Sequence, residues 1–368
     1  MKVIVLQEKL HTALPFITKS VNTKTQLPIL GNILLATDQG RLQITATNLE
    51  TSLSIWIGAS IEEEGAITVP ARFFQELVSS FTREKIELKS DEVKLEMVCG
   101  ESSATLSGIP ASEYPQPPEL KRDEKISLDT GILEKGLTFV SIAASTDESR
   151  PLLTGINLLP KKGKLLMVAT DGYRLSIKEI PEEPRLTQNV VVSARALGDV
   201  FRLAASEGAS MVEMCFSRSA NQVAFLLENA EVTTRLIDGD YPPFERIIPT
   251  SFTTQVVFDR TELLRAVKFA AVYAKESANI IKFSVQDGLV VVSANTPQVG
   301  ENKTSLTVKT EGEGGEIAFN ARFLLDLLSV FPEESVVFEM TGPLAPGAFK
   351  PLNDSSYLHI IMPVRVQG

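Results

Sequence analysis

The chain has 368 residues, of which 43% are hydrophobic and 22% are charged, an ordinary composition for a soluble globular protein. No stretch approaches 18 consecutive apolar residues, which argues against a membrane-spanning helix, and the N-terminus, MKVIVLQEKLH, predicts no signal peptide. The net charge of −10 argues against a nucleic-acid-binding protein without excluding one, because a basic stripe can lie on an acidic body.

The predicted elements follow the same order three times along the chain. A strand leads into an amphipathic helix, strands follow, a further strand leads into a second helix, and more strands close the copy. We expect the helices near residues 7–20, 71–81, 129–144, 193–206, 259–275 and 321–331. Strands such as KIELKS (85–90), VKLEMVC (93–99) and EVTTRLI (231–237) alternate apolar and polar residues, as in a half-buried sheet. Each copy is therefore predicted to be α+β, with antiparallel sheets and two helices packed on one side.

Two sequence motifs occur once in each of the three copies. The first reads PARFFQELV (70–78), SARALGDVF (193–201) and NARFLLDLL (320–328), and its arginines lie 123 and 127 residues apart. The second has its central alanines at Ala46, Ala169 and Ala294, spaced 123 and 125 residues apart. Because both motifs recur at nearly the same spacing, they indicate three copies of a domain of roughly 120 residues. With joints at 115–124 and near 249–254, we expect domains at 1–120, 126–249 and 253–368.

The predicted helices have an apolar and a basic face. In the helix near 259–275, Leu263 and Val267 fall on one side, while Arg265 and Lys268 fall on the other. Asp259 is expected to cap its start, with Glu262 completing a capping box.

Two interpretations of the basic faces stay open. Acids follow the repeated arginines at i+4, as Arg72–Glu76, Arg195–Asp199 and Arg322–Asp326, so these pairs can bridge on a solvated face. An arginine in a first helical turn, however, meets the positive end of the helix dipole. Three such arginines at the same place suggest a use beyond solubility, namely contact with phosphate.

Catalytic signals are weak. His11 and His359 are the two histidines, and each is expected to be structural. No phosphate loop, nucleophile elbow or zinc-protease motif occurs, and Asp171, Asp238 and Asp240 lie in sequences typical of turns. We expect Cys99 and Cys215 to be reduced and to lie in the core or in strands, as in a cytosolic protein. We expect no catalytic residue, no metal site and no cofactor, and a cytoplasmic protein.

Five motifs resemble a known family in their order and spacing. They are LPILGNILL (27–35), TVPAR (68–72), ATDGYRL (169–175), LIDGDYPPFERIIP (236–249) and IIMPVRV (360–366). Together they resemble the bacterial sliding clamp family, the beta subunits of DNA polymerase III, over essentially the whole chain. The resemblance implies a non-catalytic processivity factor for DNA replication. It implies a head-to-tail homodimer whose six domains form a ring, with helices lining the hole.

The resemblance also implies how such a ring would act on double-stranded DNA. Weak phosphate contacts without base readout would let it slide, and tethering would keep the polymerase near its template. The basic helix faces and the loop before LPIL would supply the phosphate contacts: Lys9, Lys19, Lys24, Arg72, Arg195, Arg202, Arg265, Lys268 and Arg322.

A peptide pocket at the junction of the second and third domains is implied as well. It would bind a short apolar clamp-binding motif of the replicative polymerase, the clamp loader and repair proteins. The matching positions are Arg150, Leu153, Thr170, Gly172, Tyr173, Arg174, Leu175, Pro242, Arg246, Ile247, Pro346, Ile360, Met362 and Val364. For Leu175, Ile247 and Ile360, ordinary core packing is the alternative. Tyr173 replaces a common His, Val364 replaces a common Met, Gln367 and Gly368 extend the usual end, and Pro346 lies on a variable loop.

The dimer contact is expected between the first domain of one chain and the third domain of the other. The candidate residues are Phe74, Leu77, Leu106, Val272 and Tyr273, with core packing as the alternative. Two other functions stay open on the residues alone: an enzyme that uses Asp171, Asp238 or Asp240, and a multidomain peptide-binding scaffold without a DNA role.

Overall fold

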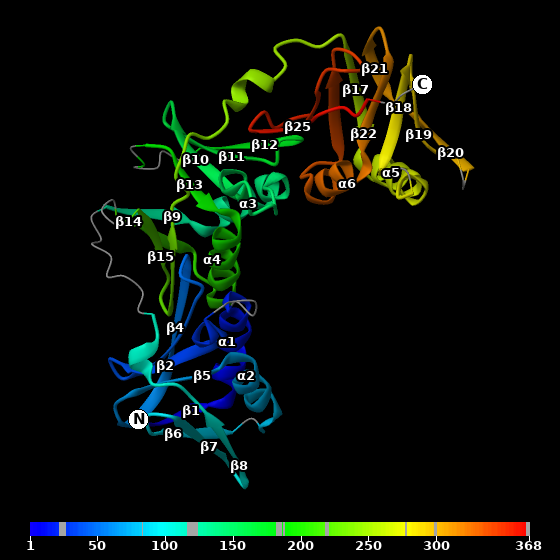
Figure 1. The fold of residues 1–368 in the computed structure, drawn as a ribbon. Coiled ribbons are helices and arrows are strands. Elements are labelled where there is room, and N and C mark those ends of the chain that lie inside the picture. The colour runs from blue at the N-terminus through cyan, green and yellow to red at the C-terminus, as the bar shows by residue number, and fades with distance from the viewer. Residues whose placement is uncertain are drawn as a thin grey trace. The chain divides into compact units, whose positions relative to one another are not determined.

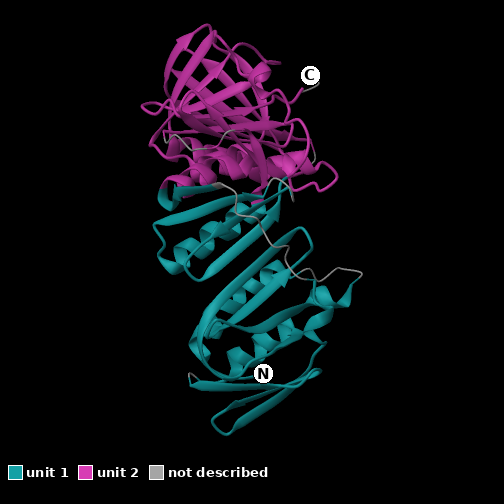
Figure 2. Ribbon diagram, turned by 90° about the vertical axis from the view of Figure 1, so that its left-hand side faces the viewer, with its two compact units in different colours: residues 1–131, 195–236 teal, residues 132–194, 237–368 magenta. Residues whose placement is uncertain are grey.

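The computed structural model describes residues 1–21, 27–82, 84–115, 124–181, 186, 188–217, 221–276, 278–297 and 300–365. The chain forms two compact units, residues 1–131 with 195–236 and residues 132–194 with 237–368 (Figures 1 and 2). The middle third of the chain contributes to both units. The three-domain boundaries stay a prediction.

Six α-helices lie in the described residues, and they confirm the predicted positions to within a few residues, except that the third ends earlier. They are α1 (Gln7–Ser20), α2 (Ala71–Ser80), α3 (Thr130–Val140), α4 (Ala194–Glu207), α5 (Arg260–Ala274) and α6 (Ala321–Val330). The chain after α3 continues as a 3₁₀ turn, Ser141–Ala143. At the start of α5, the Asp259 carboxylate accepts the Glu262 backbone N–H at 2.8 Å, which confirms the predicted cap.

The described residues of the first unit form one antiparallel sheet of twelve strands. Its main path runs in the order β8-β7-β6-β1-β4-β16-β15-β14-β9, and β2, β3 and β5 pair beside it. The bounds are β1 (Lys2–Leu6), β2 (Asn32–Asp38), β3 (Arg41–Thr47), β4 (Thr51–Glu63), β5 (Ala66–Pro70), β6 (Lys85–Ser90), β7 (Lys94–Cys99), β8 (Ser102–Ser107), β9 (Glu124–Asp129), β14 (Met211–Ser217), β15 (Gln222–Leu226) and β16 (Ala230–Arg235).

In the second unit, the part of the chain that the structure describes forms two antiparallel sheets, of nine and four strands. Their orders are β13-β10-β11-β12-β25-β24-β23-β17-β21 and β20-β19-β18-β22. The bounds are β10 (Gly155–Lys161), β11 (Lys164–Thr170), β12 (Arg174–Ile180), β13 (Val190–Ser193), β17 (Thr254–Asp259), β18 (Ile280–Gln286), β19 (Leu289–Thr296), β20 (Gly300–Thr307), β21 (Lys309–Gly312), β22 (Gly315–Asn320), β23 (Ser335–Met340), β24 (Gly347–Pro351) and β25 (Tyr357–Ile361). The predicted α+β class with antiparallel sheets is confirmed.

The helices pack against the sheets and against each other through apolar faces. The helical period places the apolar residues of each helix on one of its sides. In the first unit, α1 packs against α2 and β4, and Leu10, Leu14 and Ile17 have no exposed surface. In the second unit, α5 packs against α6 over an aromatic cluster. Phe319 meets Phe283 and Phe338 edge to face at 5.8 and 5.9 Å between ring centroids, arrangements worth about 0.5–1.5 kcal/mol each beyond burial.

The cysteines behave as the sequence indicates. Cys99 ends β7 and Cys215 lies in β14, and both cysteines are buried and outside any disulfide. Among the described residues, no helix is both long and apolar enough to cross a bilayer.

Candidate functional site

The ATDGYRL segment forms a tight turn between β11 and β12. The Asp171 carboxylate accepts the backbone N–H groups of Tyr173 and Arg174, each at 2.9 Å. The Thr170 hydroxyl donates to the Arg174 carbonyl at 2.6 Å and accepts the Gly172 N–H at 3.0 Å. Gly172 has φ of +90°, which favours glycine. The turn presents Tyr173 to solvent with 60% of its surface exposed.

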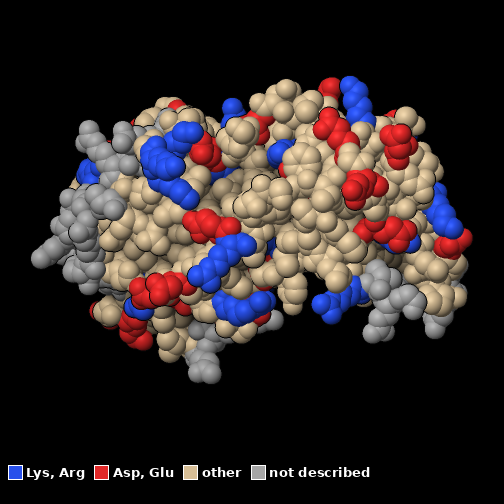
Figure 3. All heavy atoms as spheres, turned by 90° about the horizontal axis from the view of Figure 1, so that it is seen from above, with Lys and Arg blue, Asp and Glu red and all other residues tan. Residues whose placement is uncertain are grey.

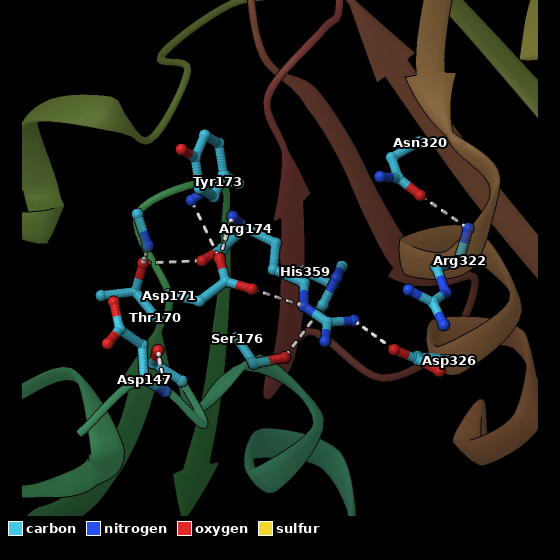
Figure 4. A network of polar contacts seen from close by, with 12 residues as sticks. Asp147, Thr170, Asp171, Tyr173, Arg174, Ser176, Asn320, Arg322, Asp326 and His359 are labelled. Atoms are coloured by element: carbon cyan, nitrogen blue, oxygen red, sulfur yellow. Dashed lines mark hydrogen bonds and ion pairs between the residues drawn. The ribbon is translucent and has the colours of Figure 1, made fainter. Parts of the chain in front are cut away.

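Arg174 is held on three sides. Its Nε donates to Asp171 Oδ2 at 3.1 Å and its Nη1 to Asp326 Oδ2 at 2.7 Å (Figure 4). Its guanidinium carbon lies 4.5 Å from the ring centroid of Phe323, a cation–π contact. Only 10% of the side chain is exposed. Arg174 thus joins the β11–β12 turn to α6.

Arg150 lies beside the same turn with a more exposed side chain. Its Nε donates to Asp147 Oδ2 at 3.1 Å, and its Nη1 reaches the Asp171 carbonyl at 3.5 Å. Hydrogen bonds from the hydroxyl and N–H of Ser149, together with Arg150, lower the pKa of Asp147. Asp147 therefore stays a carboxylate and fixes Arg150 at the surface.

Apolar residues lie beneath the turn. Leu175 and Ile360 are directly opposite each other on β12 and β25, and they pack with Val168 and Phe244 into one buried cluster. Since neither Leu175 nor Ile360 has exposed surface, the core alternative describes both. Ile247, by contrast, is 37% exposed.

The C-terminal segment passes over this region. The Met362 N–H donates to the Tyr173 carbonyl, and the Val364 N–H donates to the Ala318 carbonyl, each at 2.8 Å. Met362 and Val364 are half-buried. The structure therefore brings Tyr173, Arg174 and Met362 together from segments that are far apart in sequence.

The remaining predicted peptide-site residues differ in exposure. Thr170 is buried, Gly172 and Arg246 are exposed, and Leu153, Pro242 and Pro346 are half-buried. Arg246 and Ile247 belong to a 3₁₀ helix, Phe244–Ile247, whose Phe244 is in the buried cluster. Sequence reasoning missed Phe323 and Asp326 as members of the site.

His359 belongs to β25, directly opposite Ser176 of β12, and is fully buried. The Ser176 hydroxyl donates its one hydrogen to the Phe139 carbonyl at 2.9 Å, so it accepts from His359 Nδ1, 2.6 Å away. His359 Nε2 is buried without a hydrogen-bond partner among the described residues. Burial first, and the charge of Arg174 second, lower the pKa of His359 to about 3. The ring is therefore neutral and structural, as expected.

The predicted phosphate contacts lie on exposed helix positions. These are Lys9, Lys19, Arg72, Arg195, Arg202, Arg265, Lys268 and Arg322, while Lys24 lies outside the described residues. Arg195 Nη2 donates to the Lys19 carbonyl at 2.7 Å, which brings two of these cations together. On the face that Figure 3 shows, basic and acidic side chains are interspersed.

The local ion pairs considered for the repeated arginines, one of the two open interpretations, are not formed among the described residues. Asp199 pairs with Arg202 instead of Arg195, and Asp326 pairs with Arg174 instead of Arg322. Within the described part of the chain, no carboxylate lies within ion-pair distance of Arg72, Arg195 or Arg322. For Asp199 and Asp326 the local spacing rule fails because another arginine, Arg202 or Arg174, holds the acid.

The dimer candidates do not all lie at the surface. Phe74 has no exposed surface and packs in the core, as the alternative describes, whereas the neighbouring Phe73 is 65% exposed. Leu77, Leu106 and Tyr273 are half-buried, and Val272 is 63% exposed. Phe269, one helical turn before Tyr273, is 51% exposed and meets Tyr273 edge to face at 6.2 Å between ring centroids.

Asp171, one of the carboxylates considered for catalysis, has a structural role in the β11–β12 turn. Both oxygens of Asp171 are occupied by the turn and by Arg174. Among the described residues, no group of three or more His, Cys, Asp or Glu could hold a metal ion.

Comparison with known proteins decides the family. Models of the N-terminal, central and C-terminal domains of the DNA polymerase III beta subunit match residues 1–118, 127–243 and 245–365. The chain belongs to the DNA polymerase III beta subunit family. Membership gives it a function in DNA replication, as a non-catalytic sliding clamp that confers processivity on the polymerase.

Relatives and solved structures agree over nearly the whole chain. The beta sliding clamp of Staphylococcus aureus strain Mu50 is 29% identical, and the match covers 94% of each chain. The beta subunit structure from Thermotoga maritima is 27% identical with a TM-score of 0.92 and full coverage of both chains. The sliding clamp of Bartonella birtlesii bound to griselimycin is 27% identical, with a TM-score of 0.94 and full coverage of both.

Proposed function

We propose that two copies of the chain close into a head-to-tail ring that encircles duplex DNA and slides along it. The observation that carries this proposal is that the repeated arginines are exposed and without ion pairs to the described carboxylates. Arg72, Arg195 and Arg322 occupy one position of the repeat, are exposed, and form no ion pair with the described carboxylates. Cations left unpaired at helix starts are suited to phosphate.

Such contacts would be weak and independent of base sequence. Each arginine that meets a phosphate releases condensed counterions, so binding falls as salt rises. Weak phosphate contacts permit sliding, and ring closure, not affinity, prevents escape. A replication subunit of this kind acts on the bacterial chromosome, in the cytoplasm.

The strand edges support the ring. β8, which carries Leu106, is the last strand on the main path of the twelve-stranded sheet. α5, which carries Val272, packs against β20, the last strand of the four-stranded sheet. A sheet edge is a template for a further strand. We propose that the β8 edge of one chain meets the β20 edge of its partner, beside Phe269 and Val272.

Around Tyr173, we propose a binding surface for short peptide motifs of the replicative polymerase, the clamp loader and repair proteins. Tyr173, Ile247 and Met362 would supply apolar contacts, with Met adapting to varied side chains. Arg150 and Arg246 are exposed and would bind carbonyl or carboxylate groups of the ligand. Leu175 and Ile360 would support the surface from below.

The ring is tested by topology. Light scattering should give a mass near twice the 40.2 kDa of one chain. Protein loaded on nicked circular DNA should stay bound after a salt wash and leave when the circle is cut once. The triple variant R72Q/R195Q/R322Q should dissociate from uncut circles no faster than the parent, yet show weaker low-salt binding to short duplexes. Equal retention on circular and linear DNA would contradict the ring, and so would a monomer at all concentrations.

The peptide surface is tested with griselimycin, the ligand bound in two of the similar clamp structures. The variant I247D should weaken its binding at least about ten-fold, because it puts a charge into an apolar contact. The matched control F73A removes an exposed aromatic residue elsewhere and should leave binding unchanged. Unchanged binding by I247D would move the site away from Ile247.

A further inference from the structure

Asp326 lies within reach of two arginines that belong to different candidate sites. Arg322 precedes it by four residues on α6, one helical turn away. Arg174 reaches it from β12, 152 residues away in sequence. Figure 4 shows the carboxylate joined to Arg174, with Arg322 on the same helix as Asp326. One acid therefore stands between the proposed peptide surface and a proposed phosphate contact.

The surroundings of Arg174 explain why it holds the carboxylate. Asp171 and Phe323 already fix its guanidinium, so little side-chain freedom is given up when Asp326 adds a third contact. The Arg174 side chain is 10% exposed and Asp326 48% exposed, so water screens their pair only in part.

Arg322 is the weaker competitor. Its side chain is exposed and would lose rotamer freedom on pairing. A basic residue placed N-terminal to its acid at i,i+4 is also the less favourable order on a helix. The Asn320 side chain accepts the Arg322 backbone N–H at 2.9 Å, which fixes the first turn of α6 while leaving the guanidinium free.

We propose that Arg174 is a positioning residue that holds Asp326 away from Arg322 and so keeps the Arg322 guanidinium free for a DNA phosphate. The proposal rests on the proposed function, in which α6 faces DNA. It gives Arg174 an effect on DNA affinity although Arg174 itself contacts no DNA. When Arg174 is replaced, Asp326 turns to Arg322 and neutralises it.

The helix α2 provides an internal comparison. Arg72 and Glu76 repeat the spacing of Arg322 and Asp326, and Phe73 at the position of Phe323 is 65% exposed. No described arginine holds Glu76. The contribution of Arg72 to DNA binding should therefore be independent of residue 174.

The test measures low-salt binding of a short fluorescent duplex to the full-length protein by anisotropy. We expect R322Q and R174Q each to weaken binding about two- to five-fold, the range of one exposed ion pair. Each should lower the salt slope by about one, because one phosphate is no longer neutralised. D326N should bind at least as well as the parent. The decisive variant is R174Q/D326N, which should recover parental affinity because the competing carboxylate is gone.

The recovery of affinity in R174Q/D326N distinguishes the positioning role of Arg174 from a merely structural one. If R174Q unfolds the turn, removing Asp326 will not restore binding, and the proposal is overturned. R174K is the second variant. It keeps a charge beside Asp171 but lacks the planar guanidinium that reaches Asp171 and Asp326 at once. It too should weaken DNA binding, and D326N should restore that binding. R174K with parental affinity would likewise overturn the proposal.

Failure of the proposed function gives a different pattern. If R322Q leaves both affinity and salt slope unchanged, Arg322 is no phosphate contact, and the premise fails at that residue. If R322Q weakens binding while R174Q and R174K do not, the premise stands and the positioning proposal is wrong. R72Q/R174Q should show the product of the two single effects, whereas R322Q/R174Q should show no more than R322Q alone.

Discussion

The helices α2 and α6 begin with the same Ala-Arg-Phe sequence in different surroundings. Phe73 of α2 is 65% exposed, whereas Phe323 of α6 carries the Arg174 guanidinium above its ring. The acid one turn after the arginine is exposed in α2, as Glu76, and is bound by Arg174 in α6, as Asp326. The same short sequence therefore starts two helices whose exposed faces differ, because Arg174 covers Phe323 and Asp326 in α6 and no such contact is made by Phe73 and Glu76 among the described residues.

The largest expected difference concerns which phenylalanine of α2 supports the fold. F74A should lower the free energy of unfolding by about 3–5 kcal/mol, because it opens a cavity in the core. F73A should change it by less than about 0.5 kcal/mol. Urea unfolding at one protein concentration, followed by the fluorescence of the single tryptophan, Trp56 of β4 in the same unit, measures both. Similar losses of stability would mean that α2 is rotated and that Phe73 also packs inside.

Sequence reasoning found what local periodicity determines. The six helices follow from apolar residues at helical spacing, and Asp259 follows from capping chemistry. The same period could have assigned Phe74 to the core, because Ala71, Phe74 and Val78 share one face. Helical periodicity could not identify the partner of Asp326. The i,i+4 spacing points only to Arg322, whereas Arg174 is distant in sequence and comes near Asp326 only after the nine-stranded sheet has formed.

The second prediction contrasts the two histidines, His359 in the second unit and His11 in the first. The pKa of His359 is lowered from 6.5 to about 3 in the folded protein. Between these values the unfolded chain binds the proton and the folded chain does not, so stability rises with pH and is lost as pH falls below 6.5. The slope should reach about 1.4 kcal/mol per pH unit.

Urea unfolding between pH 5 and 7 checks this slope before most carboxylates protonate. H359Q should start from a lower stability, because the Ser176 contact changes, but should lose less on acidification than the parent. H11Q, on exposed α1 surface, is the matched control, because it replaces a histidine while keeping His359 and the contribution of His359 to the slope. Parallel pH profiles for H359Q and the parent would show that the folded protein accommodates the protonated ring.

The smallest expected effect concerns how the two helices begin. α6 has a side-chain cap, Asn320, whereas Pro70 at the start of α2 provides none. N320A should cost about 1 kcal/mol and N320G only a few tenths, while N320D should keep the cap. Hydrogen exchange at the Arg322 amide, which Asn320 accepts, should speed up most in N320A. D259A in α5 removes an equivalent cap and should match N320A. If N320A changes neither exchange nor stability, the start of α6 needs no more support than that of α2, and the Arg174 contacts alone distinguish the two helices.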